Sequence, residues 1–365
     1  MSTESIKSKV SVEQSGVLLV CGVPGIGKST LSSKLHEYIN SQHNVWSFLF
    51  SYDDIITGSL ENELIKLNAW KSSRYFIMKL VRILITYINS YYPILDNLEK
   101  YIDQEMLNLN DHDYFVSNLN ESILNSIKMN FVQLFQIELA KYDESNKKND
   151  SIRFVFILDD IFYYESMRYC YYKQSIDLNC SYMSLCLKTN NFNLLLERNK
   201  YRDLNKQLSE SIIENIFKKF DYPDELEWEK SFTIVLMNDN INLNDSSYLA
   251  NLFERIDSTF KQFNSFLISL NEKFKLNEQN QAFNKQSIEN LIHKSDIILR
   301  KLVSDKLKEI LNKIEKSIMA NKLNKRKAEI LDELKSLDKK NELNYLFENQ
   351  FIENELKFKL YETLF

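Results

Sequence analysis

Val17-Leu-Leu-Val-Cys-Gly22-Val-Pro-Gly-Ile-Gly27-Lys28-Ser29-Thr30 joins an apolar, strand-like stretch to the pattern G-x-x-x-x-G-K-[ST] and then to a helix-like sequence. Glycine backbone can turn tightly enough for successive N–H groups to face phosphate oxygens, and the following helix adds its positive N-terminal end. The chain has only 5 glycines, and four of them lie between residues 16 and 27. The stretch therefore predicts a phosphate-binding loop (P-loop), against the alternative of a glycine-bearing turn with an incidental Lys-Ser pair.

The P-loop pattern also assigns individual roles. Lys28 is expected to reach the β- and γ-phosphates of a nucleotide, and the Ser29 hydroxyl is expected to ligate Mg²⁺. The residues predicted to bind the cofactor are Gly22, Pro24, Gly25, Ile26, Gly27, Lys28, Ser29 and Thr30.

Length and composition limit the class of protein. With 365 residues and 44% hydrophobic content, the chain can form more than one compact domain. A net charge of −5 excludes a global basic field, so contact with nucleic acid needs a local patch. The longest apolar stretch, 76–88, contains Lys79 and Arg82 at helical spacing, so we expect no membrane span, and we expect no signal peptide. The cysteines form no C-x-x-C pair, which favours reduced thiols in a cytoplasmic protein.

Acidic residues follow two further strand-like runs. Asp53 and Asp54 come just after the run 45–50, and Asp159 directly follows the run 154–158. Ligands of α/β sheets bind at the carboxyl ends of the strands, where these carboxylates are expected to lie. Asp53 or Asp54 would then orient or deprotonate an attacking hydroxyl, or hold Mg²⁺ through water, and Asp159 would be the magnesium-side carboxylate. The alternative for the first pair is a simple helix N-cap.

Two arginines later in the chain, Arg198 and Arg202, are four residues apart and so share one helix face. On the lid of a kinase, arginines with this spacing neutralise the charge of the transferred phosphoryl group. The alternative is an arginine pair on a solvated helix.

Five strand-like runs alternate with helical patterns from 16 to 237. This alternation predicts an α/β fold with a doubly wound, mainly parallel sheet, interrupted by a helical insertion at about 90–150. The polar link 238–247 ends the pattern, and 248–365 is expected to form an all-α C-terminal domain. Within 294–340 there are 14 lysines and arginines against 8 acidic residues, which is either a local basic patch or an ordinary solvated helical face.

Taken together, these motifs resemble those of the O-phosphoseryl-tRNA(Sec) kinase family, which phosphorylates serine already attached to selenocysteine tRNA. The resemblance extends over both predicted domains, apart from 90–150. Besides the P-loop, it rests on Tyr52-Asp-Asp54, Trp70-Lys71 with Arg74, Leu158-Asp-Asp160 with Tyr163-Tyr-Glu-Ser-Met-Arg168, Arg198-Asn-Lys-Tyr-Arg202, Phe220-Asp-Tyr-Pro223 with Trp228, and His293-Lys-Ser-Asp296 with Arg300-Lys301.

The resemblance implies ATP and Mg²⁺ as cofactors and seryl-tRNA(Sec) as the substrate, with Arg198 and Arg202 as the lid pair. Of the two acidic residues after the second strand, it favours Asp54 over Asp53 as the catalytic carboxylate. The substrate or tRNA contacts that it implies are Tyr163, Arg168, His293, Arg300, Lys301, Lys325 and Lys327. One departure is that Ile161 and Phe162 stand where family members usually have an asparagine.

Two other functions stay open. The first is that of the Elongator-associated P-loop ATPases, which act in tRNA wobble-uridine modification and tend to have Gly-Phe/Tyr-Arg where this chain has Ser166-Met167-Arg168. That difference favours the kinase. The second is a small-molecule kinase whose C-terminal helices are an interaction module. The sequence does not decide between a monomer and a homodimer.

Overall fold

The structure is a computed structural model. It describes residues 11–92, 95, 97–108, 119–145, 151–203, 206–223, 227–238, 241–279, 285–310, 312–338, 356–357 and 359–360. The chain divides into two compact units, Met1–Leu267 and Ile268–Phe365. The division falls inside a long helix, α11, and not in the polar link 238–247. The polar stretch 108–120 of the expected insertion lies largely outside the described residues.

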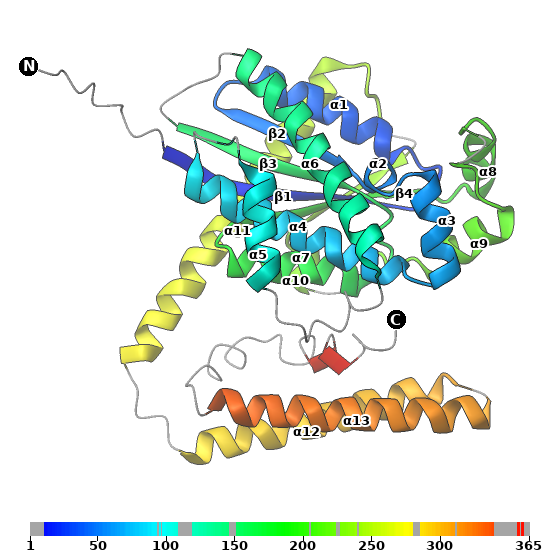
Figure 1. Cartoon of the computed structure of the whole chain (residues 1–365), viewed down its shortest axis with the longest axis vertical. Coiled ribbons are helices and arrows are strands. Elements are labelled where there is room, and N and C mark those ends of the chain that lie inside the picture. Colours follow the sequence, from blue (N-terminus) through cyan, green and yellow to red (C-terminus); the bar gives the residue numbers. More distant parts are fainter. Residues whose placement is uncertain are drawn as a thin grey trace, which may run out of the picture. The chain divides into compact units, whose positions relative to one another are not determined.

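A parallel sheet of five strands forms the centre of the first unit, in the order β2-β3-β1-β4-β5 (Figure 1). Every strand pair is parallel, so the prediction of a mainly parallel sheet is confirmed. Strand β4, which lies between β1 and β5, is buried along almost its whole length, as expected for an inner strand covered on both faces. The strands are β1 (Ser11–Cys21), β2 (Val45–Ser51), β3 (Ser151–Asp159), β4 (Ser181–Lys188) and β5 (Thr233–Met237).

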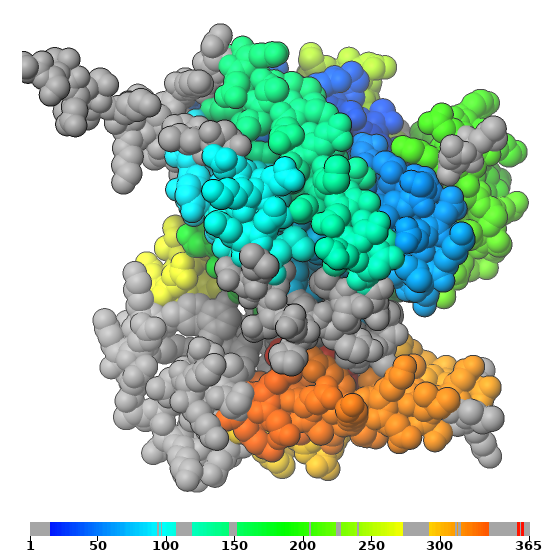
Figure 2. All heavy atoms as spheres, viewed as in Figure 1, coloured from blue at the N-terminus to red at the C-terminus, as the bar shows by residue number. Residues whose placement is uncertain are grey.

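Helices connect and cover the strands. In the first unit these are α1 (Lys28–Ser41), α2 (Tyr52–Ile55), α3 (Gly58–Leu67), α4 (Trp70–Tyr91), α5 (Leu98–Asn108), α6 (Glu121–Glu144), α7 (Glu165–Asp177), α8 (Phe192–Lys200), α9 (Glu210–Lys219) and α10 (Glu227–Lys230). The helix α11 spans Ser246–Gln279, and α12 (Lys285–Lys308) and α13 (Lys313–Asp338) follow it. Within 90–150, the structure describes α5 and α6, which form much of one face of the first unit (Figure 2).

Alternation along β2 places helices on both faces of the sheet. Phe48 and Phe50, two residues apart, pack on Phe135 and Phe131 of α6 with ring centroids 5.3 and 4.7 Å apart. Ser47, which points to the opposite face, contacts α1 through His36 at 2.9 Å. The sheet is therefore doubly wound, as its sequence pattern predicted.

Gly16 gives α11 room to pack close to β1. A Cβ atom at position 16 would lie 3.0 Å from the ring of Phe260, which is itself buried. One turn before Phe260, Asp257 of α11 pairs with Arg153 of β3 at 2.6 Å. The first part of α11 is therefore integral to the fold of the first unit.

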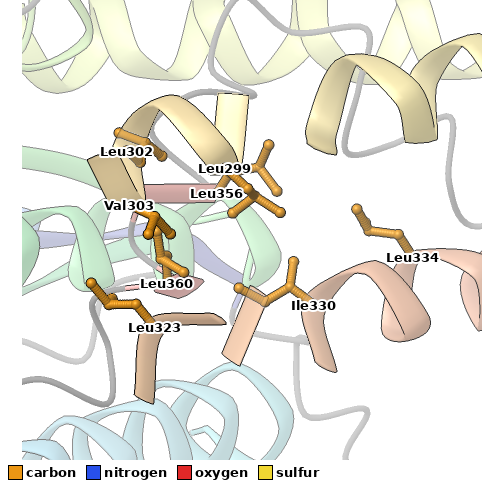
Figure 3. Packing of buried hydrophobic residues seen from close by; sticks show 8 residues of the cluster. All are labelled: Leu299, Leu302, Val303, Leu323, Ile330, Leu334, Leu356 and Leu360. Carbon is orange, nitrogen blue, oxygen red and sulfur yellow. The ribbon is translucent and has the colours of Figure 1, made fainter. Parts of the chain in front are cut away.

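The second unit is helical and has its own apolar core. In Figure 3, leucine, isoleucine and valine side chains of α12 and α13 meet those of a short C-terminal segment. Lys327 of α13 also pairs with Asp296 of α12 at 3.3 Å. The buried core residues are Leu299, Leu302, Val303, Leu323, Ile330, Leu334, Leu356 and Leu360.

Candidate functional site

The P-loop forms the turn between β1 and α1. Three of its glycines have positive φ angles: Gly22 at 150°, Gly25 at 80° and Gly27 at 103°. At Gly25, a Cβ atom would lie 2.8 Å from the carbonyl oxygen of Leu195. Alanine at this position would both strain the backbone and collide with α8. All eight residues predicted to bind the cofactor lie in this turn or in the first turn of α1.

Lys28 and Arg198 converge on this loop. Lys28 Nζ donates a hydrogen bond to the carbonyl of Val23 at 3.2 Å. Burial lowers the pKa of Lys28, while Asp159 and then Asp160 oppose that shift. From α8, Arg198 Nη1 donates to the carbonyl oxygen of Ile26 at 3.0 Å. The structure thus places one of the two predicted lid arginines directly against the P-loop.

Asp159, at the end of β3, has surroundings that suit a carboxylate that holds Mg²⁺. Its side chain is buried, and its Oδ1 atom has no hydrogen-bond partner among the described residues. Burial raises its pKa to about 6, although Lys28 and a hydrogen bond from Ser29 act in the opposite direction. Because the pKa is raised, ionised Asp159 costs folding free energy above pH 6, and a bound cation would offset that cost. A buried carboxylate oxygen beside a serine hydroxyl is a donor set that suits Mg²⁺.

The next residue, Asp160, has a different environment. Both of its oxygens accept hydrogen bonds from Arg74 of α4, Oδ2 from Nε at 2.6 Å and Oδ1 from Nη2 at 3.0 Å. The guanidinium carbon of Arg74 lies 5.3 Å from the ring centroid of Trp70, one turn earlier in α4. Two consecutive carboxylates thus differ, because one is fully paired and the other is not.

Asp53 and Asp54 lie in the first turn of α2, just past the end of β2. Asp53 Oδ2 is 3.3 Å from Arg202 Nη2, and Asp54 Oδ1 is 3.9 Å from Lys206 Nζ. The helix N-cap is Ser51, so neither aspartate is the cap that the alternative interpretation required. Both carboxylates are more than half exposed and therefore accessible to a substrate.

Arg168 is located in the core of the first unit. It is completely buried, and it donates to both carboxylate oxygens of Glu229 and to the carbonyls of Phe162 and Asp221. This geometry corrects the expectation that Arg168 contacts substrate or phosphate, because four of its five N–H groups are used inside the protein. Tyr163, in contrast, is only partly buried and packs on Tyr164 with ring centroids 3.9 Å apart.

Ile161 and Phe162 stand where the kinase family that the motifs resemble usually has an asparagine, and both make contacts within the protein. Phe162 has a φ of 43° and is buried, and its ring meets those of Tyr52 and Tyr171 edge to face. The carbonyl of Ile161 accepts a hydrogen bond from the N–H of Gly22 at 3.2 Å. The segment after β3 therefore supports the P-loop through its backbone and adds an aromatic side chain to the core.

The other predicted substrate or tRNA contacts, after Tyr163 and Arg168, lie in the second unit and differ in their surroundings. Lys327 is 19% exposed and pairs with Asp296, whereas Arg300, on the same aspartate at 2.6 Å, is 69% exposed. His293, Lys301 and Lys325 are exposed. Lys327 thus joins two helices, and the others present their side chains to solvent.

Sequence reasoning did not assign some residues that the structure brings to the site. Arg74 was recognised only as part of a motif, although its position four residues after Trp70 is a signal for a shared helix face. Lys206 near Asp54, and Asn238, whose Oδ1 accepts from Arg198 at 3.0 Å, had no local signal.

A parallel sheet in this strand order, with a G-x-x-x-x-G-K-S turn at the end of its central strand, defines a P-loop kinase-like α/β protein with a helical C-terminal region. The family model described as "Chromatin associated protein KTI12" matches residues 16–353, so the chain belongs to the KTI12 family.

Two further comparisons concern individual proteins. The L-seryl-tRNA(Sec) kinase of Mus musculus is 22% identical over 342 residues, covering 89% of this chain and 86% of the mouse protein. The resemblance drawn from the motifs is thus found again over most of the chain. The crystal structure of Chaetomium thermophilum Kti12 in complex with ADP-AlF3 shares 15% identity and covers 67% of this chain and 98% of its own, with a TM-score of 0.35.

Two features are absent from the described residues. None of their helices is long and apolar enough to cross a membrane. No group of three or more histidine, cysteine, aspartate or glutamate residues among them could hold a metal ion.

Proposed function

We propose that this chain transfers the γ-phosphoryl group of ATP in a Mg²⁺-dependent reaction that involves a bound tRNA. The observation that carries this proposal is the convergence of Lys28, the orphaned carboxylate of Asp159 and the lid residue Arg198 around one P-loop. Phosphoryl transfer requires positioning and charge neutralisation more than covalent chemistry by the protein, and this site offers both.

Each group has a role in such a reaction. Lys28 would bind the outer phosphates, and Arg198 and Arg202 would neutralise charge on the transferred group. Ser29 and Asp159 would hold Mg²⁺, which supplies electrostatic stabilisation of the phosphate oxygens when bound. Asp53 or Asp54 would orient the attacking hydroxyl, since both lie at the same sheet edge and are accessible.

The acceptor is either water or a seryl hydroxyl. Membership of the KTI12 family favours tRNA-dependent ATP hydrolysis of the Elongator-associated kind, in wobble-uridine modification. The mouse relative supports a second candidate, phosphorylation of Ser-tRNA(Sec) to O-phosphoseryl-tRNA(Sec), an intermediate in selenocysteine biosynthesis. In both, lysines of the second unit would bind tRNA phosphates, so the affinity should fall steeply with salt.

One experiment separates these functions. Purified protein is incubated with Mg²⁺ and γ-labelled ATP, either alone or with seryl-tRNA(Sec), seryl-tRNA(Ser), uncharged tRNA or free serine. Label on seryl-tRNA identifies the kinase, and free phosphate that increases with uncharged tRNA identifies the ATPase. Label on free serine identifies a small-molecule kinase. If neither free phosphate nor labelled acceptor forms, phosphoryl transfer is wrong for this protein.

In the Asp54→Asn variant, turnover should fall by roughly 10²-fold or more, with ATP affinity nearly unchanged, because a general base acts on the acceptor rather than on the nucleotide. The matched variant Asp53→Asn should have a smaller effect, since it mainly breaks the pair with Arg202. Turnover and ATP binding are measured separately. A full loss in Asp53→Asn with none in Asp54→Asn would reverse the assignment.

Two lysines of α13 should respond differently to reversal of their charge. Lys325→Glu should weaken tRNA binding and reduce the salt dependence by about one phosphate contact, with little change in Tm. Lys327→Glu should also lower Tm, because Lys327 pairs with the partly buried Asp296. Lys66→Glu, on an exposed part of α3, is the control and should leave both unchanged. Equal tRNA affinity in all three variants would contradict tRNA binding by this face.

A further inference from the structure

The ion pair between Arg74 and Asp160 has an unusual position. It lies at the carboxyl end of β3, next to the proposed metal carboxylate, yet its cation comes from α4 on a different part of the chain. The Asp160 side chain is 4% exposed and the Arg74 side chain is 22% exposed. Arg74 uses Nε and Nη2 in parallel, so both carboxylate oxygens are occupied by one guanidinium.

The local charge balance explains why such a pair is needed. Asp159 and Asp160 are consecutive and both nearly buried, and Lys28 interacts electrostatically with each of them. A buried carboxylate without a partner attracts any nearby cation, because leaving it unpaired is costly. Without Arg74, the Asp160 carboxylate would compete for Lys28, with which it already interacts, and for a metal ion at Asp159, the two groups that the nucleotide requires.

Arg74 is held in place by a helix and not by a loop. Trp70 and Arg74 share one face of the first turns of α4, and the Trp70 ring lies against the guanidinium. The next turns of this helix are fixed by buried side chains, including Phe76, Ile77 and Leu80. The guanidinium is therefore presented to Asp160 from a rigid support. A lysine could not reproduce it, because an ammonium group cannot form the parallel pair.

The geometry points to Arg74 as a positioning residue for nucleotide binding, which holds both oxygens of Asp160 and so keeps Lys28 and Asp159 available for the phosphates and Mg²⁺. This inference rests on the nucleotide-binding part of the proposed function and does not depend on the acceptor. It also gives the motif residue Arg74 of α4 a task at the site.

The test measures binding and not turnover. A fluorescent ADP analogue is titrated into the full chain with Mg²⁺ and with EDTA, for the wild type, Arg74→Ala, Arg74→Lys, Asp160→Asn and the double variant Arg74→Ala/Asp160→Asn. Arg74→Ala should weaken Mg²⁺-dependent binding roughly tenfold or more, as expected for a residue that supports a metal site. The double variant should return to within about threefold of the wild type, because the carboxylate charge that Arg74 balances is gone.

A second ion pair in the same unit provides the matched control. Arg153 and Asp257 are 2.6 Å apart and similarly shielded, with side chains 17% and 22% exposed, but they join β3 to α11 and take no part in the proposed site. Arg153→Ala should lower Tm about as much as Arg74→Ala does, but it should leave nucleotide affinity within about twofold of the wild type. If Arg74→Ala loses nucleotide affinity and Arg153→Ala does not, the loss is due to the position of Arg74 beside the site and not to the removal of a shielded ion pair in general.

The outcomes are distinct. Wild-type affinity in Arg74→Ala, no recovery in the double variant, or an equal loss in Arg153→Ala would each overturn the inference. If Arg74→Ala does not fold, Arg74→Lys replaces it, with reduced affinity that Asp160→Asn restores. If the wild type binds Mg²⁺-nucleotide as expected but transfers no phosphoryl group, the proposed function fails while this inference stands. A wild type that binds no nucleotide would overturn both.

Discussion

In the Lys28→Ala variant, nucleotide turnover falls by about 10²–10³-fold, because the site loses the cation that stabilises charge on the outer phosphates. Stability should not fall with it. Burial lowers the pKa of Lys28, so keeping this group charged in the folded state costs free energy at any pH below its folded pKa. At neutral pH, the variant is therefore expected to unfold at the same temperature as the wild type or at a higher one.

The measurements are ATP turnover and Tm, with Lys34→Ala as the control. Lys34 lies on the same helix, is 43% exposed and pairs with Glu37. Its removal should affect neither quantity by more than a small amount. Loss of turnover together with a large fall in Tm in Lys28→Ala would show that Lys28 holds the loop together, contrary to the role proposed here.

The largest expected effect on stability comes from Arg168→Met. Removing one partner of a buried ion pair costs about 3–5 kcal/mol of unfolding free energy, because the other charge stays buried without compensation. Here the remaining charge is Glu229, whose side chain is 2% exposed. Urea unfolding measures the loss. The double variant Arg168→Met/Glu229→Leu should recover most of it, since apolar side chains can replace such a pair.

The pH dependence of that loss gives a second check. Burial raises the pKa of Glu229 even with Arg168 present to oppose the shift, and without Arg168 it should rise further. For a carboxyl group with a raised pKa, stability is present at low pH and is lost as the pH rises through the folded pKa. The deficit of Arg168→Met should therefore be smaller near pH 5 than at pH 8. A deficit that does not change with pH would point to lost packing and not to the stranded charge.

The strand runs, the P-loop and the position of Asp159 could be predicted from the sequence because their signals are local. An apolar run, a glycine pattern and a carboxylate at a strand end are each readable within a few residues. The pairing of Arg74 with Asp160, 86 residues away, is a property of the tertiary fold. The same holds for Arg168, whose partner Glu229 is 61 residues away. Neither partner could be chosen without the structure.

The motif that ends in Arg168 and the family match favour different candidate functions. The sequence Ser166-Met167-Arg168 favoured the kinase over the Elongator-associated ATPases, whereas the family model assigns the chain to the KTI12 family. The arginine of this motif is a buried structural residue, and its N–H groups bond to Glu229 and to backbone carbonyls inside the protein. A change of residues there carries little information about which acceptor the site serves.

The close approach of Phe260 to Gly16 has a consequence for the evolution of the chain. The ring would lie only 3.0 Å from any side chain at position 16, so the volume of one residue limits that of the other. Relatives that carry alanine or serine at the first position should compensate with a smaller residue at the second, and substitutions at the two sites should be correlated across lineages.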